Sequence, residues 1–495
     1  MSVDAVGARI DARAWGWRHA GRSDWALSGI DLIIAPGERV LLLGASGAGK
    51  STFLHALAGV LGGDDDGEAH GELLVDNQAP NIVRGRVGLL LQDPDAQVIL
   101  ARVGDDVAFG CENLGVPRDE IWRRVDAALT AVGLALPLDH PTSALSGGQK
   151  QRLALAGLLA MQPGLLLLDE PTANLDSDGV QEVRAAVETV VAKTGATLVV
   201  IEHRVSIWRE LVDRVIVFSA GGGVLADGTP DRVLAEQGES LAAAGVWVPG
   251  FPPARPVRAA RRDTNAVLTT EALVIGRNAR AVHGEPIAVE LEGGRALAIT
   301  GPNGSGKSTL ALTIGGLLPP VTGTVSAAGL ANGGAEEPIS WKSKELLTRI
   351  GTVFQDPEHQ FVAATVRDEL AVGPRALGLP EHEIEARIAH LAERLRLGAL
   401  LSANPFTLSG GEKRRLSVAT VLATRPPLVI LDEPTFGQDS RTWQELVALL
   451  AELLDDGTSI VAVTHDREFI AAIADQELQL VVPTRARRDD GESAR

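Results

Sequence analysis

One eight-residue pattern occurs twice in this chain of 495 residues and constrains its fold more than any other feature. Residues 44–51 read Gly-Ala-Ser-Gly-Ala-Gly-Lys-Ser and residues 301–308 read Gly-Pro-Asn-Gly-Ser-Gly-Lys-Ser, so both fit G-x-x-x-x-G-K-[ST]. The apolar run 39–43 predicts a buried strand before the first copy, and residues 52–58 predict a helix after it. A glycine-rich turn between a strand and a helix N-terminus gathers backbone N–H groups around phosphate. The pattern therefore predicts a nucleotide phosphate site in each half.

Each copy of the pattern assigns a role to its residues. Lys50 and Lys307 are predicted to reach the β- and γ-phosphates, and Ser51 and Ser308 to ligate Mg²⁺. The other predicted nucleotide-binding positions are Gly44, Ser46, Gly47, Gly49 and Thr52 in the first copy, and Gly301, Asn303, Gly304, Gly306 and Thr309 in the second.

Further short segments recur in the same order in both halves, which identifies the chain as a duplicated domain. A Gln-Asp-Pro segment begins at Gln92 and again at Gln355, and a Leu-Ser-Gly-Gly segment contains Ser146 and again Ser409. The glutamine and the serine are 54 positions apart in both halves. From the serine to the first acid of an Asp-Glu-Pro-Thr segment there are 23 positions in both halves. Such agreement does not arise by chance.

Two pairs of acidic residues favour a site that hydrolyses the nucleotide as well as binding it. Asp169 and Asp432 each end an apolar strand, which suits an acid placed near Mg²⁺. Glu170 and Glu433 follow directly, and a carboxylate beside the γ-phosphate can orient or deprotonate the attacking water. An Asp-Glu pair can also be a plain surface turn at a strand end, but the matched Pro-Thr that follows both pairs favours a site.

Two histidines and two glutamines complete the predicted site. His203 and His465 sit just beyond the next strand in each half, where an imidazole can hydrogen-bond the γ-phosphate. A single histidine there would more often be structural, and the repetition favours function. Gln92 and Gln355 are amides able to touch both Mg²⁺ and water from a movable loop, a role inferred from context.

Composition sets limits on the function. A net charge of −18 argues against the broad basic surface of a nucleic-acid-binding protein, although a local basic patch stays compatible with it. The single cysteine, Cys111, allows no internal disulfide and fits a reducing cytoplasm. No stretch reaches the 18 or more apolar residues of a membrane span, so we expect no intrinsic span.

With these motifs in place, the chain resembles a tandem ATP-binding-cassette (ABC) ATPase over its whole length apart from a linker and a tail. The resemblance implies an α/β fold of two P-loop ABC ATPase domains, each a RecA-like core with an antiparallel β subdomain and a helical subdomain. It implies ATP and Mg²⁺ as cofactors. We expect a first domain at 1–245, a Pro/Arg-rich linker at 246–265, a second domain at 266–483 and a disordered tail at 484–495. The linker arginines would either contact acidic or lipid surfaces or, as we favour, stay solvated.

The resemblance also assigns the remaining site residues. In this family the signature segment of one cassette caps the ATP held by the other, which adds a set of nucleotide-binding residues, Ser146, Gly147, Gly148, Ser409, Gly410 and Gly411. Trp17 occupies the place of the family's adenine-stacking aromatic residue. The second half has no aromatic residue there, and Arg277 is the candidate to stack by its guanidinium plane. No catalytic motif is degenerate, so we expect two hydrolytic sites.

A finer resemblance concerns the kind of ABC protein. The segments 92–97 and 105–115, and their counterparts 355–360 and 368–373, are similar to ATPases of energy-coupling-factor (ECF) importers. That resemblance implies uptake of a vitamin or metal ion, with an integral membrane scaffold subunit and a substrate-binding membrane subunit as partners. It places the chain at the cytoplasmic face of the membrane as a peripheral subunit, without nucleic acid.

Other kinds of tandem ABC protein remain as alternatives. A tandem ABC ATPase acting on the ribosome usually has a long charged helical linker, and one acting on DNA has zinc cysteines or long coiled coils. This chain has a short Pro/Arg linker and an acidic balance. Fused sugar-importer ATPases usually carry a degenerate cassette, which is not found here.

Overall fold

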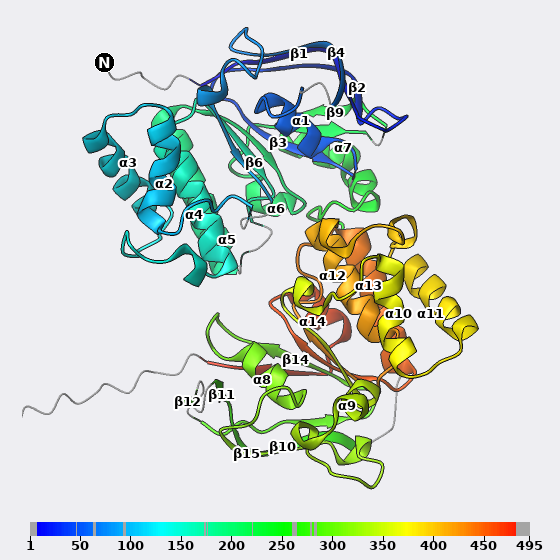
Figure 1. The fold of residues 1–495 in the computed structure, drawn as a ribbon. Coiled ribbons are helices and arrows are strands. Elements are labelled where there is room, and N and C mark those ends of the chain that lie inside the picture. The colour runs from blue at the N-terminus through cyan, green and yellow to red at the C-terminus, as the bar shows by residue number, and fades with distance from the viewer. Residues whose placement is uncertain are drawn as a thin grey trace, which may run out of the picture. The chain divides into compact units, whose positions relative to one another are not determined.

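A computed structural model describes residues 7–45, 47–62, 66–92, 96–172, 175, 177–219, 221–259, 265–277, 280–281 and 285–481. The chain divides into two compact units, residues 1–253 with 439–441, and residues 254–438 with 442–495 (Figure 1). Ser46, the tail 484–495 and linker residues 260–264 lie outside the described residues. No helix of the described residues is long and apolar enough to cross a membrane.

The first unit is built around a six-stranded sheet in the order β5-β6-β7-β3-β8-β9, parallel except for β9. Its central strands carry the apolar runs Leu-Leu-Leu-Leu-Asp and Thr-Leu-Val-Val-Ile, and every residue of both is buried. Strands buried on both faces are typical of parallel sheets covered by helices. The strands are β3 (Arg39–Gly44), β5 (Val87–Leu90), β6 (Leu165–Asp169), β7 (Thr197–Ile201), β8 (Arg214–Phe218) and β9 (Val224–Gly228).

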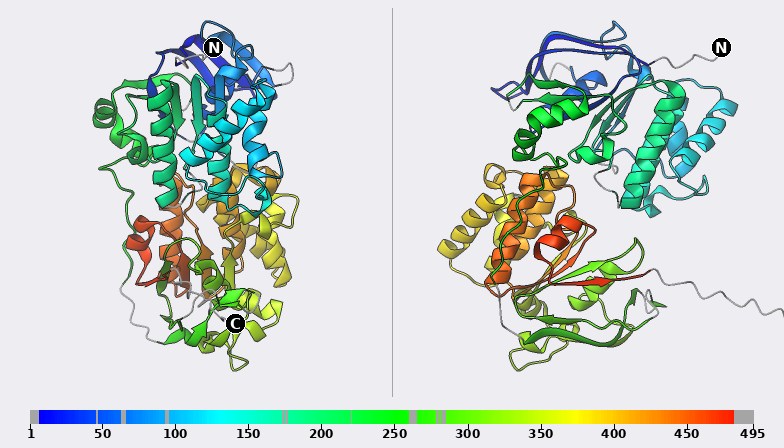
Figure 2. Two further views of the ribbon diagram at one scale, coloured as in Figure 1. Left: turned by 90° about the vertical axis from the view of Figure 1, so that its left-hand side faces the viewer. Right: turned by 180° about the vertical axis from the view of Figure 1, so that it is seen from behind.

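Two smaller layers complete the first unit. An antiparallel sheet of β1 (Ile10–His19), β2 (Leu27–Ile34) and β4 (Gly67–Val75) lies on the opposite side from the helical layer in Figures 1 and 2. The helical layer comprises α2 (Val103–Asn113), α3 (Arg118–Ala131) and α4 (Gly147–Ala160). The other helices are α1 (Lys50–Leu57), α5 (Ser177–Thr194), α6 (Val205–Trp208) and α7 (Pro230–Ala243).

The second unit repeats this plan. Its parallel sheet has the order β16-β17-β18-β14-β19, and an antiparallel sheet has the order β13-β10-β15. The strands are β10 (Ala266–Val274), β11 (Gly276–Arg277), β12 (Arg280–Ala281), β13 (Glu290–Glu292), β14 (Ala296–Thr300), β15 (Thr322–Ser326), β16 (Ile350–Val353), β17 (Leu428–Asp432), β18 (Ser459–Val463) and β19 (Gln476–Gln479). The helices are α8 (Lys307–Ile314), α9 (Ser343–Arg349), α10 (Val366–Ala376), α11 (Glu381–Arg394), α12 (Gly410–Leu422), α13 (Ser440–Asp455) and α14 (Arg467–Ile473).

The predicted fold class is confirmed. The apolar pattern from about Asp105 to Val132 predicts helical structure, which the structure forms as two helices, because α2 ends at Asn113 and α3 begins at Arg118. Gly115 between them has φ 69°, a left-handed conformation that ends a helix, and Pro117 lies just before the first residue of α3.

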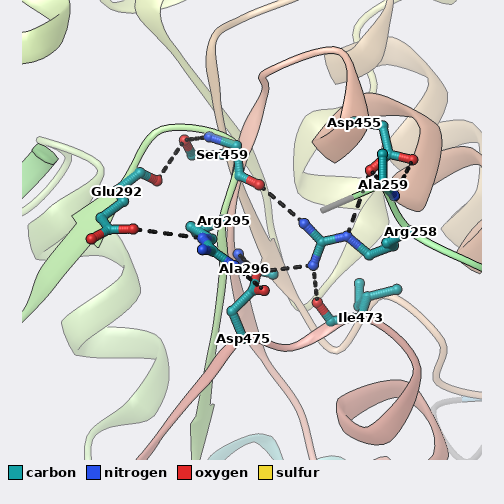
Figure 3. A network of polar contacts seen from close by, with 10 residues as sticks. Arg258, Ala259, Glu292, Arg295, Ala296, Asp455, Ser459, Ile473 and Asp475 are labelled. Carbon is teal, nitrogen blue, oxygen red and sulfur yellow. Dashed lines mark hydrogen bonds and ion pairs between the residues drawn. The ribbon is translucent and has the colours of Figure 1, made fainter. Parts of the chain in front are cut away.

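The linker packs against the folded units more closely than a solvated connector would. Val246 and Val248 are buried in the core of the first unit. In the second unit the guanidinium of Arg258 donates hydrogen bonds to the carbonyl oxygens of Ile473 (3.0 Å) and Gly294 (3.1 Å) and to Asp475 Oδ2 (2.9 Å), as Figure 3 shows. Contact with acidic side chains, one of the two alternatives left open above, is therefore what the structure shows for this arginine.

Candidate active site

Both phosphate loops require glycine where the sequence has it. In the first unit Gly44, Gly47 and Gly49 have φ 147°, 80° and 82°, values that L side chains rarely adopt. A Cβ on Gly44 would lie 2.6 Å from the carbonyl oxygen of Phe218, and a Cβ on Gly301 would lie 2.3 Å from that of Leu480. The glycines therefore allow the loop to pass directly over the neighbouring strand and to end at the N-terminus of α1 or α8.

The loop lysines are buried and held by their own loops. Lys50 Nζ donates to the carbonyl oxygens of Gly44 (2.9 Å) and Ala45 (3.0 Å), and Lys307 Nζ to those of Gly301 (2.9 Å) and Pro302 (3.0 Å). Burial lowers the pKa of Lys50, while the charges of Glu170 and Asp169 oppose that shift. Each unit thus holds an ammonium group inside the loop, beside the acidic pair.

The first acid of each pair ends a central strand and is suited to a magnesium ion. Burial raises the pKa of Asp169 to about 6, opposed by a hydrogen bond with Ser51. Asp432 has a raised pKa for the same reason and is hydrogen-bonded to Ser308. Asp432 Oδ1 is buried and makes no hydrogen bond within the described part of the chain. Carboxylate and hydroxyl oxygens are the hard ligands that Mg²⁺ takes beside phosphate oxygens and water, so the donor set fits this ion.

The second acid of each pair has an unusual backbone conformation. Glu170 and Glu433 have φ 48° and 51°, in the left-handed region. Their backbone N–H groups donate to the carbonyl oxygens of Ile201 (3.0 Å) and Val463 (2.9 Å) on the adjacent strands. Non-glycine residues in this region cost about 1–3 kcal/mol and concentrate at functional sites. The turn thereby fixes the direction of each carboxylate.

In the first unit Glu170 has both predicted partners. His203 Nε2 lies 2.9 Å from Oε1, and Gln92 Nε2 donates to Oε2 at 2.7 Å. Burial alone would raise the pKa of Glu170, but the hydrogen bonds from His203 and Gln92 and the charges of His203 and Lys50 outweigh burial and lower it. For His203, burial alone would lower the pKa, but the hydrogen bond and the charge of Glu170 outweigh burial, so the pKa of His203 is raised. Three predicted residues are thus brought together.

The second unit arranges the same residues less tightly. His465 Nε2 lies 3.7 Å from Glu433 Oε1, and the Gln355 side chain is exposed. Burial and the charge of Asp432 raise the pKa of Glu433 to about 7. The two sites therefore share their residues but shift the pKa of the glutamate in opposite directions, downward for Glu170 and upward for Glu433.

The signature serines cap the helices that follow them. Ser146 is the N-cap of α4 and Ser409 the N-cap of α12, each in a capping box with the residue three positions later. In the described part of the chain each hydroxyl accepts one hydrogen bond, at 3.4 Å, from the backbone N–H of Gln149 or Glu412. Both serines and the glycines directly after them are exposed, at helix N-termini of a kind that favours anions.

The prediction that Trp17 stacks on adenine is contradicted by its burial. Trp17 is only 3% exposed and lies in the core beneath the antiparallel sheet, so its ring faces are covered. Its Nε1 donates to Nδ1 of His19 (3.3 Å), and His19 Nε2 lies 3.3 Å from Thr52 Oγ1 on α1. The half-buried ring beside the phosphate loop is therefore that of His19, which sequence reasoning missed.

The second unit has an arginine at the equivalent position. Ala14 and Ala272 both have positive φ (45° and 44°), and a Cβ on the facing Gly71 or Gly323 would lie 2.3 Å from the carbonyl oxygen of the respective alanine. Counting five residues from these alanines leads to His19 and to Arg277, which is exposed at the end of β11. The alanine with positive φ that faces a glycine occurs in both units, and it is the feature that places His19 and Arg277 at equivalent positions.

Sequence reasoning also missed Arg414, which braces the second glutamine loop. Its buried guanidinium donates to the carbonyl oxygens of Phe354 (2.9 Å), Gln355 (2.5 Å) and Asp432 (3.2 Å). The first unit has Gln151 at this position of the signature helix, where it is buried and neither amide atom has a hydrogen-bond partner among the described residues. The sequence signal that could have pointed to Arg414 is the difference between Lys-Arg-Arg in the second half and Lys-Gln-Arg in the first, just after the signature segments.

Comparisons with known proteins identify the family of the chain. The family model described as ABC transporter matches residues 27–173 and 285–436. "Putative HMP/thiamine import ATP-binding protein YkoD" of Bacillus subtilis (strain 168) is 35% identical over 481 residues, which cover 91% of this chain and 86% of that protein. A "Putative ABC transporter ATP-binding protein" of Methanosarcina acetivorans is 32% identical over 502 residues, covering 91% of this chain and 81% of that protein.

A solved structure shows the same fold across the chain. An archaeal ribosome recycling factor, aABCE1, in complex with the archaeal ribosomal stalk protein aP1, has a TM-score of 0.62, covering 94% of this chain and 87% of its own. The sequences are 20% identical, so this likeness concerns the fold alone. Because the family model matches both halves and the Bacillus relative extends across nearly the whole chain, this protein belongs to the ABC transporter family and is a tandem ABC ATPase.

Proposed function

We propose that this ATPase is the energy-supplying subunit of an ECF-type importer and drives uptake of a vitamin or metal ion. An integral scaffold subunit and a substrate-binding membrane subunit would be its partners, at the cytoplasmic face of the membrane. The Bacillus relative is named for HMP/thiamine import, which supports the importer class and suggests a thiamine-related cargo as the first to test.

The observation that carries this proposal is a matched pair of exposed apolar residues beside the glutamine loops. Ile99 is 62% exposed and Val362, at the equivalent position, is 75% exposed. Exposed apolar side chains are common singly, but these two recur at the same point of both halves. Such residues suit contact with the apolar or amphipathic helices of a membrane protein.

Both residues are held by the same rigid construction. Asp106 Oδ1 accepts the backbone N–H groups of Ile99 (2.8 Å) and Leu100 (2.7 Å). Glu369 Oε2 accepts those of Val362 (2.9 Å) and Ala363 (2.7 Å) in the second unit. A carboxylate that binds two successive N–H groups fixes the backbone and keeps the apolar side chain outward.

The glutamine loops are braced at the same place. Gln97 Oε1 accepts the backbone N–H of Leu91 (2.9 Å), next to Gln92, and Gln360 Oε1 accepts that of Phe354 (2.8 Å), next to Gln355. A partner helix pressing on Ile99 or Val362 would therefore act on the segment that carries the site glutamine. This supports a route by which nucleotide state and a membrane subunit influence each other.

Purification of the tagged chain from detergent-solubilised membranes tests the proposal. We expect the chain to recover a scaffold and a small binding subunit, and expect I99E and V362E to lose both while still binding ATP. Ile82 is 70% exposed elsewhere on the first unit, and I82E is the matched control that should retain them. Recovery of ribosomes instead of membrane subunits would favour the ribosome alternative, for which the likeness to aABCE1 offers the fold alone.

The remaining nucleotide contacts form part of the same proposal. His19 and Arg277 are proposed to contact the adenine base, the first by its ring and the second by its guanidinium plane. Ser146 and Ser409 remain proposed ligands of the γ-phosphate, and Asp169 and Asp432 would hold Mg²⁺. The bound ion would neutralise phosphate charge, while Glu170 and Glu433 orient the attacking water or take its proton.

A further inference from the structure

A buried polar cluster lies directly behind the histidine of the first unit. Thr172, which follows the acidic pair and its proline, donates its hydroxyl to Glu202 Oε2. Glu202 immediately precedes His203, and its Oε1 accepts the backbone N–H of that histidine (3.0 Å). Trp208 Nε1 donates to the same Oε2 at 3.4 Å. Thr172 and Glu202 are each 5% exposed, and Trp208 is fully buried.

The second unit contains the same three chemical groups. Thr435 Oγ1 donates to Asp466 Oδ2 at 2.8 Å, and Trp443 Nε1 donates to the same oxygen at 2.7 Å. Asp466 immediately follows His465, and its Oδ1 accepts the backbone N–H groups of Glu468 (3.0 Å) and Phe469 (3.2 Å) at the start of α14.

The threonines occupy equivalent positions, whereas the other two groups do not. The carboxylate precedes the histidine in the first unit and follows it in the second, where Thr464 stands before His465. The indole comes from α6 in the first unit and from α13 in the second. One arrangement of hydroxyl, carboxylate and indole has thus been retained although two of its three residues changed position, which indicates a requirement for the arrangement itself.

We propose that Glu202 and Asp466 are positioning residues for His203 and His465. Each carboxylate ties the turn that carries the histidine to the Pro-Thr turn after the acidic pair, so the imidazole and the glutamate keep one relative placement. The indole N–H fixes which carboxylate oxygen faces the threonine. This inference concerns ATP hydrolysis itself and does not depend on the importer assignment.

The donors around Asp466 make the proposal testable by a double-mutant cycle in the full chain. In D466N an NH₂ group faces two donors; the Thr435 hydroxyl can rotate to accept from it, but the indole N–H cannot. W443F removes that indole donor and leaves a site that an asparagine can satisfy. We expect D466N to lower kcat at least twofold with the KM for ATP unchanged, and W443F to restore part of the lost kcat in the double variant.

Two further comparisons separate positioning from stability. T435V removes only the hydroxyl and should lower kcat, whereas T435S keeps it and should restore the rate. The same cycle with E202Q and W208F should give the same result in the first unit. D456N, which neutralises an exposed acid just after α13, is the control and should match the parent chain. Thermal unfolding of each variant shows which are folded, and the threonine pair keeps the test open if D466N does not fold.

The proposal would be overturned if the effects of D466N and W443F on kcat simply added in the double variant. It would also be overturned if T435V kept full kcat, or if the variants changed only the KM for ATP.

Discussion

Replacing Arg258 by alanine should release the linker from the second unit. The guanidinium makes two hydrogen bonds to backbone carbonyl oxygens and one to Asp475, at 2.9–3.1 Å, and the side chain is 17% exposed. At the low end for charged hydrogen bonds, about 1.5 kcal/mol each, three such contacts amount to about 4.5 kcal/mol. Truncation recovers about 2 kcal/mol of arginine side-chain entropy, so a net loss of about 2.5 kcal/mol is expected.

Hydrogen exchange at the Ala259 amide measures this loss. That N–H donates to Asp455 (3.2 Å to Oδ1), beside Arg258, so it becomes exchangeable when the linker detaches. A loss of about 2.5 kcal/mol corresponds to roughly 70-fold faster exchange. R255A is the matched control, because the Arg255–Glu468 pair is 54% and 43% exposed and contributes at most about 1 kcal/mol.

Unchanged exchange in R258A, or equal acceleration in R255A, would refute the conclusion that buried geometry at Arg258 holds the linker. The comparison uses two arginines three residues apart in the same segment. It therefore separates the buried network from a general effect of basic residues near acidic ones.

Five other substitutions, which test three separate points, have definite expected outcomes. E170Q and E433Q should each lower ATP turnover substantially without loss of ATP binding; full ATPase activity in either would refute two working sites. H19A should raise the Kd for ATP with little change in Tm, whereas W17A should lower Tm, since truncating a buried tryptophan costs about 3–5 kcal/mol. Burial alone would raise the pKa of Asp475, but hydrogen bonds from Arg258, the Ala296 amide and Arg295 outweigh it and lower it. Asp475 therefore stabilises the fold above its unfolded pKa of about 3.9 and loses this as pH falls through the lower folded value, so D475N should lower Tm more at pH 7 than at pH 3.

The sequence predicted those parts of the site that depend on local pattern. A strand, a glycine-rich turn and a helix start are all encoded within about 20 residues, and the duplication supplied an internal check for each motif. The position of Trp17 could not be read in this way. Which side chain of a strand faces the core depends on register, and the irregularity at Ala14 shifts that register by an amount that spacing does not reveal.

Contacts between residues far apart in the sequence were the other feature that the sequence did not predict. Arg414 looks like an ordinary basic residue in a charged segment, and only the folded structure brings it to three carbonyl oxygens from two strand ends. The carboxylates Glu202 and Asp466 escaped notice for a related reason. They occupy different places in the two halves, so the comparison of repeats that found the other site residues passes over both.

The backbone conformation of the two site glutamates has a consequence for how this enzyme can evolve. A residue at φ 51° is strained unless it is glycine, and Glu433 also carries a raised pKa because burial and the charge of Asp432 disfavour its ionised form. Replacing it by glycine would relieve both penalties while abolishing its chemistry. Inactive descendants of this cassette that carry glycine at this position are thus expected to be more stable to heat than the active parent. Selection for ATP turnover must therefore act continually against a substitution that stabilises the fold.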